Sequence, residues 1–303
     1  MDSSKLKYVY LVVLSLIWGS SFILIKKALG QSEHGLTLQP LQVGAIRTII
    51  SGIILVLIGY KSFLKTDKKY YGWLFVSGLL GTFFPAFLFA YAQTEIDSAI
   101  SAILNSTVPL ITLILGAVIF GIAFSRIQLT GVIIGLLGAV GLVLAGMENN
   151  PDQNYLFAGL VFIACACYAT NVNIIKRYLQ DVKPLAIATG NFIFIVPLAA
   201  GVFFFADGQN LEFESELVLK SLGYILVLCL FGTVAAKIMF NKLVQITSPV
   251  FASSVTYLMP VVGLSWGMLD GEEFNVWQVL STAVIIFAVI LVTSNKKQPT
   301  PSS

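Results

Sequence analysis

Charged residues are scarce in this sequence, and their scarcity excludes a water-soluble domain. They make up 11% of the 303 residues, whereas 57% of the residues are hydrophobic and the mean hydropathy is +0.89. A soluble domain carries about 25% charged residues. Because this chain has too little polar surface to face water on all sides, we expect an integral membrane protein.

Metal-binding and catalytic residue types are also rare. His34 is the only histidine, and the three cysteines all lie in apolar runs. Cys165 and Cys167 are two residues apart and so point to different helix faces, which disfavours a metal pair. The chain has no Gly-x-x-x-x-Gly-Lys-Ser/Thr loop for nucleotide phosphates, so direct use of ATP is unsupported. We expect no metal, no cofactor and no enzymatic activity.

Acidic residues are missing from the middle of every long apolar stretch. A buried carboxylate is a common proton relay in membrane carriers. Its absence argues against a proton-driven pump for cations. It favours a neutral, zwitterionic or anionic solute.

What the chain does contain is a series of apolar stretches, each close to the ~20 residues that a spanning helix needs. Connections between them are short. We therefore predict an all-α integral membrane protein with ten transmembrane helices, at residues 8–29, 41–60, 71–92, 98–120, 127–146, 155–176, 184–205, 219–241, 249–269 and 276–293.

The stretches fall into two weakly similar five-helix units, residues 1–147 and 148–303. Because five is an odd number, the second unit must enter the membrane from the opposite side. Such inverted repeats are typical of secondary transporters, whose solute binds near the midplane between the halves. Positions aligned at shifts of 150 or 151 residues are Ser15 and Cys165, Trp18 and Tyr168, Ser21 and Asn171, Phe89 and Phe240, Pro109 and Pro260, and Gly116 and Gly267.

Lysine and arginine collect in alternate loops. With the N-terminus inside, thirteen of them lie in inner loops and tails, and Lys220 is the only one clearly in an outer loop. Basic residues mark the cytoplasmic side, so we predict that both termini are cytoplasmic. The inner residues are Lys5, Lys7, Lys61, Lys65, Lys68, Lys69, Arg126, Lys176, Arg177, Lys183, Lys242, Lys296 and Lys297.

Several motifs make the chain similar to the EamA family of the drug/metabolite transporter superfamily. They are Trp18-Gly19-Ser20-Ser21-Phe22, Arg47, the alanine-containing stretch with a central proline in each half, and Gly271-Glu272. The first half departs from the pattern, because Gly121-Ile122-Ala123-Phe124 contains no acid. The resemblance implies ten helices, cytoplasmic termini, transport of a small organic solute, and a central cavity lined by the first, third, fourth, sixth, eighth and ninth stretches.

Two polar stripes are candidates for that cavity. Trp18 and Ser21 share one face of the first stretch, as Tyr168 and Asn171 do in the sixth, because their spacing is that of a helix face. Trp and Tyr usually lie at the membrane surface, but these two are near mid-depth. We expect them to line the cavity; packing between helices, with the Trp18 N–H bonded across the bundle, is the alternative.

Prolines in the fourth and ninth stretches free a backbone carbonyl beside a polar side chain. Pro109 cannot donate to the carbonyl of Asn105, and Pro260 cannot donate to that of Thr256. We expect both prolines to be kinks or gates, with Asn105 and Thr256 as solute contacts and Tyr257 as a second aromatic wall. A packed kink without solute contact is the alternative.

Two cations lie within apolar stretches. Lys237 shares a helix face with Thr233, and intramembrane cations usually mark function. For Lys237, contact with an anionic solute group is one expectation, and a snorkelling or structurally paired lysine is the other. Thr233 is expected to contact the solute from the same helix face. Arg47 is expected to serve architecture or an outer gate, paired with Glu33 or Glu95, rather than to touch solute.

The sequence thus predicts a transporter or facilitator in the bacterial cytoplasmic membrane. Its binding site would open to each side of the membrane in turn, by alternating access. Export of small metabolites such as amino acids follows from the resemblance alone. A lipid or lipid-headgroup translocase, a small-solute channel and an enzyme using Asp270, Glu272 and Glu273 are the alternatives. The expected partners are a small-molecule solute and the bilayer, with no nucleic acid; monomer and homodimer are both open.

Overall fold

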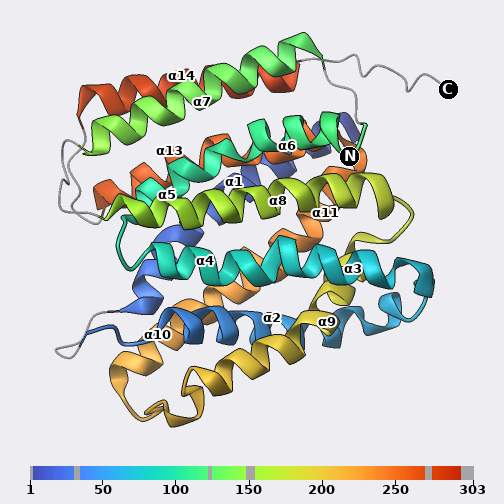
Figure 1. Ribbon diagram of the computed structural model, residues 1–303, viewed down its shortest axis with the longest axis vertical. Coiled ribbons are helices and arrows are strands. Elements are labelled where there is room, and N and C mark those ends of the chain that lie inside the picture. Colours follow the sequence, from blue (N-terminus) through green and yellow to red (C-terminus); the bar gives the residue numbers. More distant parts are fainter. Residues whose placement is uncertain (1–2, 31–34, 122–124, 148–153, 270–274, 295–303) are drawn as a thin grey trace.

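The computed structural model describes residues 3–30, 35–121, 125–147, 154–269 and 275–294, and every element in these ranges is a helix (Figure 1). The α-helices are α1 (Ser3–Leu29), α2 (Pro40–Phe63), α3 (Tyr71–Gly78), α4 (Phe84–Ala92), α5 (Ser98–Leu104), α6 (Val108–Val118), α7 (Arg126–Met147), α8 (Ala158–Tyr178), α9 (Pro184–Phe205), α10 (Glu216–Val227), α11 (Ala236–Ile246), α12 (Pro249–Ser253), α13 (Val255–Leu269) and α14 (Val276–Ser294).

Six short segments of other helical geometry complete the chain. The 3₁₀ segments are η1 (Lys68–Tyr70), η3 (Asn105–Thr107), η4 (Tyr155–Phe157) and η5 (Gly208–Asn210). The π-helical segments are η2 (Leu79–Phe83) and η6 (Leu228–Ala235), and each lies within a longer rod. Residues 68–92 form the first rod, with η2 between α3 and α4, and residues 216–246 form the second, with η6 between α10 and α11.

Eight helices in the described part of the chain are long and apolar enough to cross a membrane. They correspond to eight of the ten predicted stretches. The other two predictions coincide with the 22-residue α7 and the 19-residue α14, which are not among these eight. Ten crossings therefore remain a prediction.

The two halves of the chain pack reciprocally rather than side by side. α2 pairs with α9 and α7 pairs with α14 (Figure 1). In addition, α1 of the first half packs against α10, α11 and α13 of the second, and α8 of the second half packs against α4 and α6 of the first. One large apolar cluster contains buried residues of both halves. The bundle thus has a common core, and the first helix of each half lies beside the third and fourth helices of the other.

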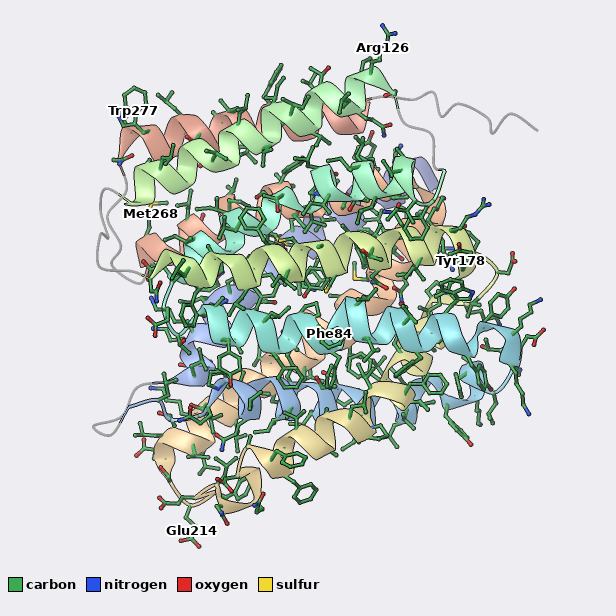
Figure 2. All side chains as sticks on the ribbon, viewed as in Figure 1. Phe84, Arg126, Tyr178, Glu214, Met268 and Trp277 are labelled. Atoms are coloured by element: carbon green, nitrogen blue, oxygen red, sulfur yellow. The ribbon has the colours of Figure 1, made fainter. Side chains whose placement is uncertain are left out.

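The outer surface and the two ends of the bundle have different character. Large apolar side chains such as Leu57, Leu137 and Phe287 are exposed, as expected of a surface in contact with lipid. Figure 2 shows Arg126 and Tyr178 at one end of the bundle and Glu214 and Trp277 at the other. We call the first the basic end and the second, which also carries Glu95 and Asp97, the acidic end.

Candidate functional site

A cavity of about 90 Å³ lies in the middle of the bundle, between the two halves. Residues of α1, α2, η2, α4 and η3 face it from the first half, and residues of α8, η6, α11, α12 and α13 face it from the second. Ligand sites usually measure 300–1,000 Å³, so in this structure the cavity is smaller than most of them. Nine residues singled out from the sequence line it: Trp18, Ser21, Arg47, Asn105, Tyr168, Asn171, Thr233, Lys237 and Thr256.

Trp18 both lines the cavity and bonds across the bundle. Its indole Nε1–H donates to the carbonyl of Gly232 at 2.9 Å. Its ring meets Phe240 edge-on, with 4.9 Å between the ring centroids. The two alternatives for this residue are therefore compatible, because Trp18 lines the cavity while its N–H is bonded to η6.

Five aromatic residues line the cavity, and the sequence did not predict three of them, Phe22, Phe89 and Phe240, as binding residues. Phe89 stacks near Tyr168 at 6.0 Å and meets Phe22 edge-on at 5.6 Å. Phe240 lies against Trp18 in the second half. Phe89 and Phe240 are repeat mates, so the similarity between the halves could have identified both as wall residues.

Polar groups in the cavity are mostly bonded to neighbouring helices. Ser77 Oγ donates to Asn171 Oδ1 at 2.6 Å, which joins α3 to α8. Asn105 Nδ2 lies 3.2 Å from Met259 Sδ. Thr82 is the exception: its hydroxyl is buried, lines the cavity and has no hydrogen-bond partner among the described residues. The sequence did not single out Thr82 as a binding residue, although it is the repeat mate of Thr233.

Lys237 is 93% buried, as its relative exposure is 7%. Its Nζ donates to the carbonyl of Gly81 in η2 at 2.5 Å rather than reaching for the membrane surface. The snorkelling alternative does not describe this conformation. Contact between Lys237 and solute stays a prediction. It is geometrically feasible, because Lys237 lines the cavity.

Arg47 lines the same cavity from α2. Its Nε donates to Thr233 Oγ1 at 3.1 Å, which joins α2 to η6. The expected ion pair with Glu95 is not formed: Glu95 lies in a separate pocket at the acidic end, and the described residues include no carboxylate within ion-pair distance of Arg47. The other expected partner, Glu33, lies outside the described residues.

Tyr257 is the predicted binding residue that the structure places elsewhere. It is fully buried in a separate apolar cluster with Val132 and Ile285, and its ring lies against Gly135. The reason is helical geometry, because successive residues point about 100° apart. Thr256 faces the cavity, so its neighbour faces α7 and α14.

Both prolines accompany interruptions of a helix. In the fourth stretch the α-helix gives way to η3 and restarts at Val108, so Pro109 occupies a favourable first-turn position. In the ninth stretch the interruption is a turn at Ser254, and Pro260 lies inside α13. Ser106 Oγ donates to the carbonyl of Thr256 at 3.3 Å, so a side chain satisfies the group that Pro260 leaves free. A gating role for either proline stays a prediction.

A second, larger pocket of about 510 Å³ opens at the acidic end. It lies further out along α1 and α4 than the cavity, and the contact between Phe22 and Phe89 lies at the level between them. At the basic end, side-chain contacts join neighbouring helices. There Trp73 of α3 stacks on Tyr178 of α8 at 3.8 Å, and Lys176 Nζ donates to the carbonyl of Thr247 at 2.7 Å.

Some sequence motifs cannot be placed. Gly271-Glu272, the acidic group Asp270, Glu272 and Glu273, and Ile122-Ala123-Phe124 all lie outside the described residues.

Comparison with known proteins identifies the family. The model of the EamA-like transporter family matches the chain twice, over residues 5–144 and 156–294. The uncharacterized inner membrane transporter YedA of Escherichia coli K12 is 30% identical over 294 residues, which cover 94% of this chain and 90% of YedA. Protein PecM of Dickeya dadantii is 25% identical, covering 92% of this chain and 89% of PecM.

The fold is shared as well. A solved crystal structure with 16% sequence identity aligns with a TM-score of 0.70, over 97% of this chain and 96% of the other. With its apolar spans, this chain is a multi-pass membrane transporter, and the family model and the similarity to YedA show that it belongs to the EamA-like transporter family.

Proposed function

We propose that this protein is a secondary transporter that exports small organic solutes bearing a carboxylate, amino acids among them, from the bacterial cytoplasm. One observation carries the proposal: the described lining of the central cavity contains Arg47 and Lys237 but no aspartate or glutamate. Two like charges that share one low-dielectric cavity repel each other and lack a counter-ion. An anionic group supplies that counter-ion.

The surroundings of the two cations favour an organic anion over an inorganic one. Rings of Trp18, Phe89 and Tyr168 line the cavity and offer apolar contact for a carbon skeleton. Thr82 Oγ1 is an unpartnered acceptor and donor for a hydroxyl or an amino group of the same solute. A charge-assisted hydrogen bond to each cation contributes about 1.5–3 kcal/mol.

Alternating access between two inverted halves is the mechanism that we propose. It is supported by the family model matching each half separately and by the reciprocal packing of α1 and α8. The small cavity must widen to hold a solute, since its volume of about 90 Å³ suits only a few water molecules. With cytoplasmic termini, the larger pocket at the acidic end would face the outside of the cell.

Counterflow in proteoliposomes tests the proposed solute class. Four labelled compounds share a benzyl group and differ in charge: phenylacetate, phenylalanine, phenylacetamide and phenethylamine. We expect trans-stimulated uptake of the first two, weak uptake of the amide and none of the amine, because only a carboxylate pairs with Arg47 and Lys237. Uptake of phenethylamine alone would refute the proposal, and flux without trans-stimulation would indicate a channel.

A further inference from the structure

The two π-helical segments occupy equivalent places in the two halves. The offset of 151 residues that separates Phe89 from Phe240 also separates Gly81 in η2 from Gly232 in η6. Such segments are rare, are typically short insertions within α-helices and are frequent at functional sites. Because both segments contain a glycine at the matching position, we infer that they have a specific structural role and are not local irregularities.

Each of these glycines accepts a hydrogen bond from a long side chain of the opposite half. Lys237 Nζ donates to the carbonyl of Gly81 at 2.5 Å, and Trp18 Nε1 donates to that of Gly232 at 2.9 Å. All four residues line the central cavity. The solute site is therefore bordered by two reciprocal bonds, each tying one half to the middle of the third helix of the other.

The close approach requires glycine at both positions. A Cβ atom on Gly81 would collide with the side-chain nitrogens of Asn171 and Lys237. A Cβ atom on Gly232 would lie 2.8 Å from Ser21 Oγ. Since real Cβ atoms do not approach other atoms so closely, a side chain at either place would push a cavity residue aside.

The two bonds differ in the charge of the donor. Lys237 brings an ammonium to a neutral carbonyl, whereas Trp18 brings a neutral N–H to the same kind of acceptor. A carboxylate competes strongly for an ammonium, because two full opposite charges attract each other in a low-dielectric cavity, whereas a carbonyl offers only a dipole. It has no such advantage at Trp18.

We propose that Lys237 is an exchangeable latch, bonded to Gly81 when the cavity is empty and to the solute carboxylate when it is filled. This inference rests on the proposed function for its ligand. Solute binding releases the carbonyl of η2 while the bond between Trp18 and Gly232 persists. A ligand shifts a conformational equilibrium only through a difference in its contacts between two states, and this exchange supplies that difference.

The released segment is connected to a contact at the basic end. α3 contains Trp73 and leads into η2, and Trp73 stacks on Tyr178 of α8 at 3.8 Å. A π-helical segment held by a side chain is a natural bending point. Freeing η2 lets α3 bend relative to α4, so the exchange at Lys237 is coupled to the position of Trp73 against α8.

Hydrogen exchange of the purified full-length protein in detergent micelles tests the latch. In wild type we expect saturating phenylacetate to speed exchange of the amides of residues 79–86 by about tenfold, as loss of one buried hydrogen bond implies. Phenylacetamide, which has the same ring but no charge, should leave exchange unchanged. Lys237→Met should exchange fast without ligand and show no further response.

Two more variants serve as a control and as a replacement for Lys237→Met. Trp18→Phe should speed exchange of residues 228–236 instead and preserve the response of residues 79–86 to phenylacetate. If Lys237→Met fails to fold, Gly81→Ala replaces it, because it displaces the ammonium without removing its charge; it should exchange fast and still bind phenylacetate.

Three outcomes separate the claims. Wild-type exchange rates in both Lys237→Met and Gly81→Ala would overturn the latch. Binding of phenylacetate, measured by calorimetry, without faster exchange would overturn the proposed swap of partners. If phenylacetate does not bind at all, the proposed function and the swap fail together, while fast exchange in Lys237→Met would still support the bond to Gly81 as a latch.

Discussion

At the scale of single residues, the cavity is defined by two cations that are each held by an uncharged partner. Lys237 is bonded to a carbonyl and Arg47 to a hydroxyl. Buried cations of this kind are costly, and they are usually retained for function. An arrangement that gives both cations only uncharged hydrogen-bond partners among the described residues is suited to binding an anion and releasing it again.

Tyr257 provides a test of where the cavity ends. Its hydroxyl is buried and has no hydrogen-bond partner among the described residues, and its ring lies outside the cavity. Tyr257→Phe should therefore leave counterflow unchanged and should raise the free energy of unfolding by up to about 1 kcal/mol, because an unsatisfied polar group is removed. Denaturant unfolding in micelles measures the second effect. A large loss of transport would mean that Tyr257 contacts solute in another conformation.

The residue types of the cavity could be predicted better than their bonds. Repeat alignment and helical spacing identified Trp18, Tyr168 and Lys237, because polar and aromatic residues at mid-depth are informative wherever they occur. Helical spacing could also have excluded Tyr257, which directly follows Thr256. The bond between Lys237 and Gly81 could not be predicted, since it joins residues 156 positions apart through a backbone atom that sequence does not mark.

At the scale of elements, hydropathy predicted the positions of the helices along the chain well, but it did not predict their local helical geometry. The predicted spans 184–205 and 249–269 match α9 and the run from α12 to α13. The eighth span is longer than predicted, at residues 216–246, because its polar ends continue the helix beyond the apolar core. The segments η2 and η6 were not foreseen, because an i to i+5 bonding pattern leaves no periodic trace in an apolar sequence.

Close packing of α2 on α9 makes a prediction at this scale. A Cβ atom on Gly59 would overlap the hydroxyl of Thr189, which donates to the carbonyl of Leu55 at 3.1 Å. Gly59→Ala should lower the free energy of unfolding by about 1–3 kcal/mol through overpacking. Thermal unfolding in micelles measures the change.

The matched control for that change is Gly201→Ala in α9. No atom lies within 4 Å of a Cβ atom placed there, so the added methyl group meets open space. Alanine is a better helix former than glycine by up to about 1 kcal/mol. Gly201→Ala should be neutral or stabilising, and equal destabilisation by both changes would contradict the close approach of α2 and α9.

At the scale of the whole molecule, the two halves are interleaved around the cavity. Sequence similarity identified the halves but could not reveal that α1 and α8 each lie beside the third and fourth helices of the other half. It also could not predict the contacts at the ends, such as the stack of Trp73 on Tyr178, because they join residues far apart in the chain.

The membrane orientation is testable with exposed residues at the two ends. Glu214 and Arg126 lie at opposite ends of the bundle (Figure 2). In a variant with the three native cysteines replaced, we expect Glu214→Cys to react with an impermeant maleimide in intact cells and Arg126→Cys to react only after lysis. This follows from the excess of basic residues on the cytoplasmic side. The reverse pattern would place the termini outside.

The central claim is that the cations of the cavity select the charge of the solute. The most direct test measures counterflow of phenylacetate and of phenylacetamide in wild type and in Lys237→Gln, and compares their half-saturating concentrations. Lys242→Gln is the control, since Lys242 is exposed on the same helix. We predict about a tenfold or greater rise for phenylacetate in Lys237→Gln alone, as loss of a charge-assisted bond implies, and little change for the amide. Equal values for phenylacetate in wild type and Lys237→Gln would contradict the account.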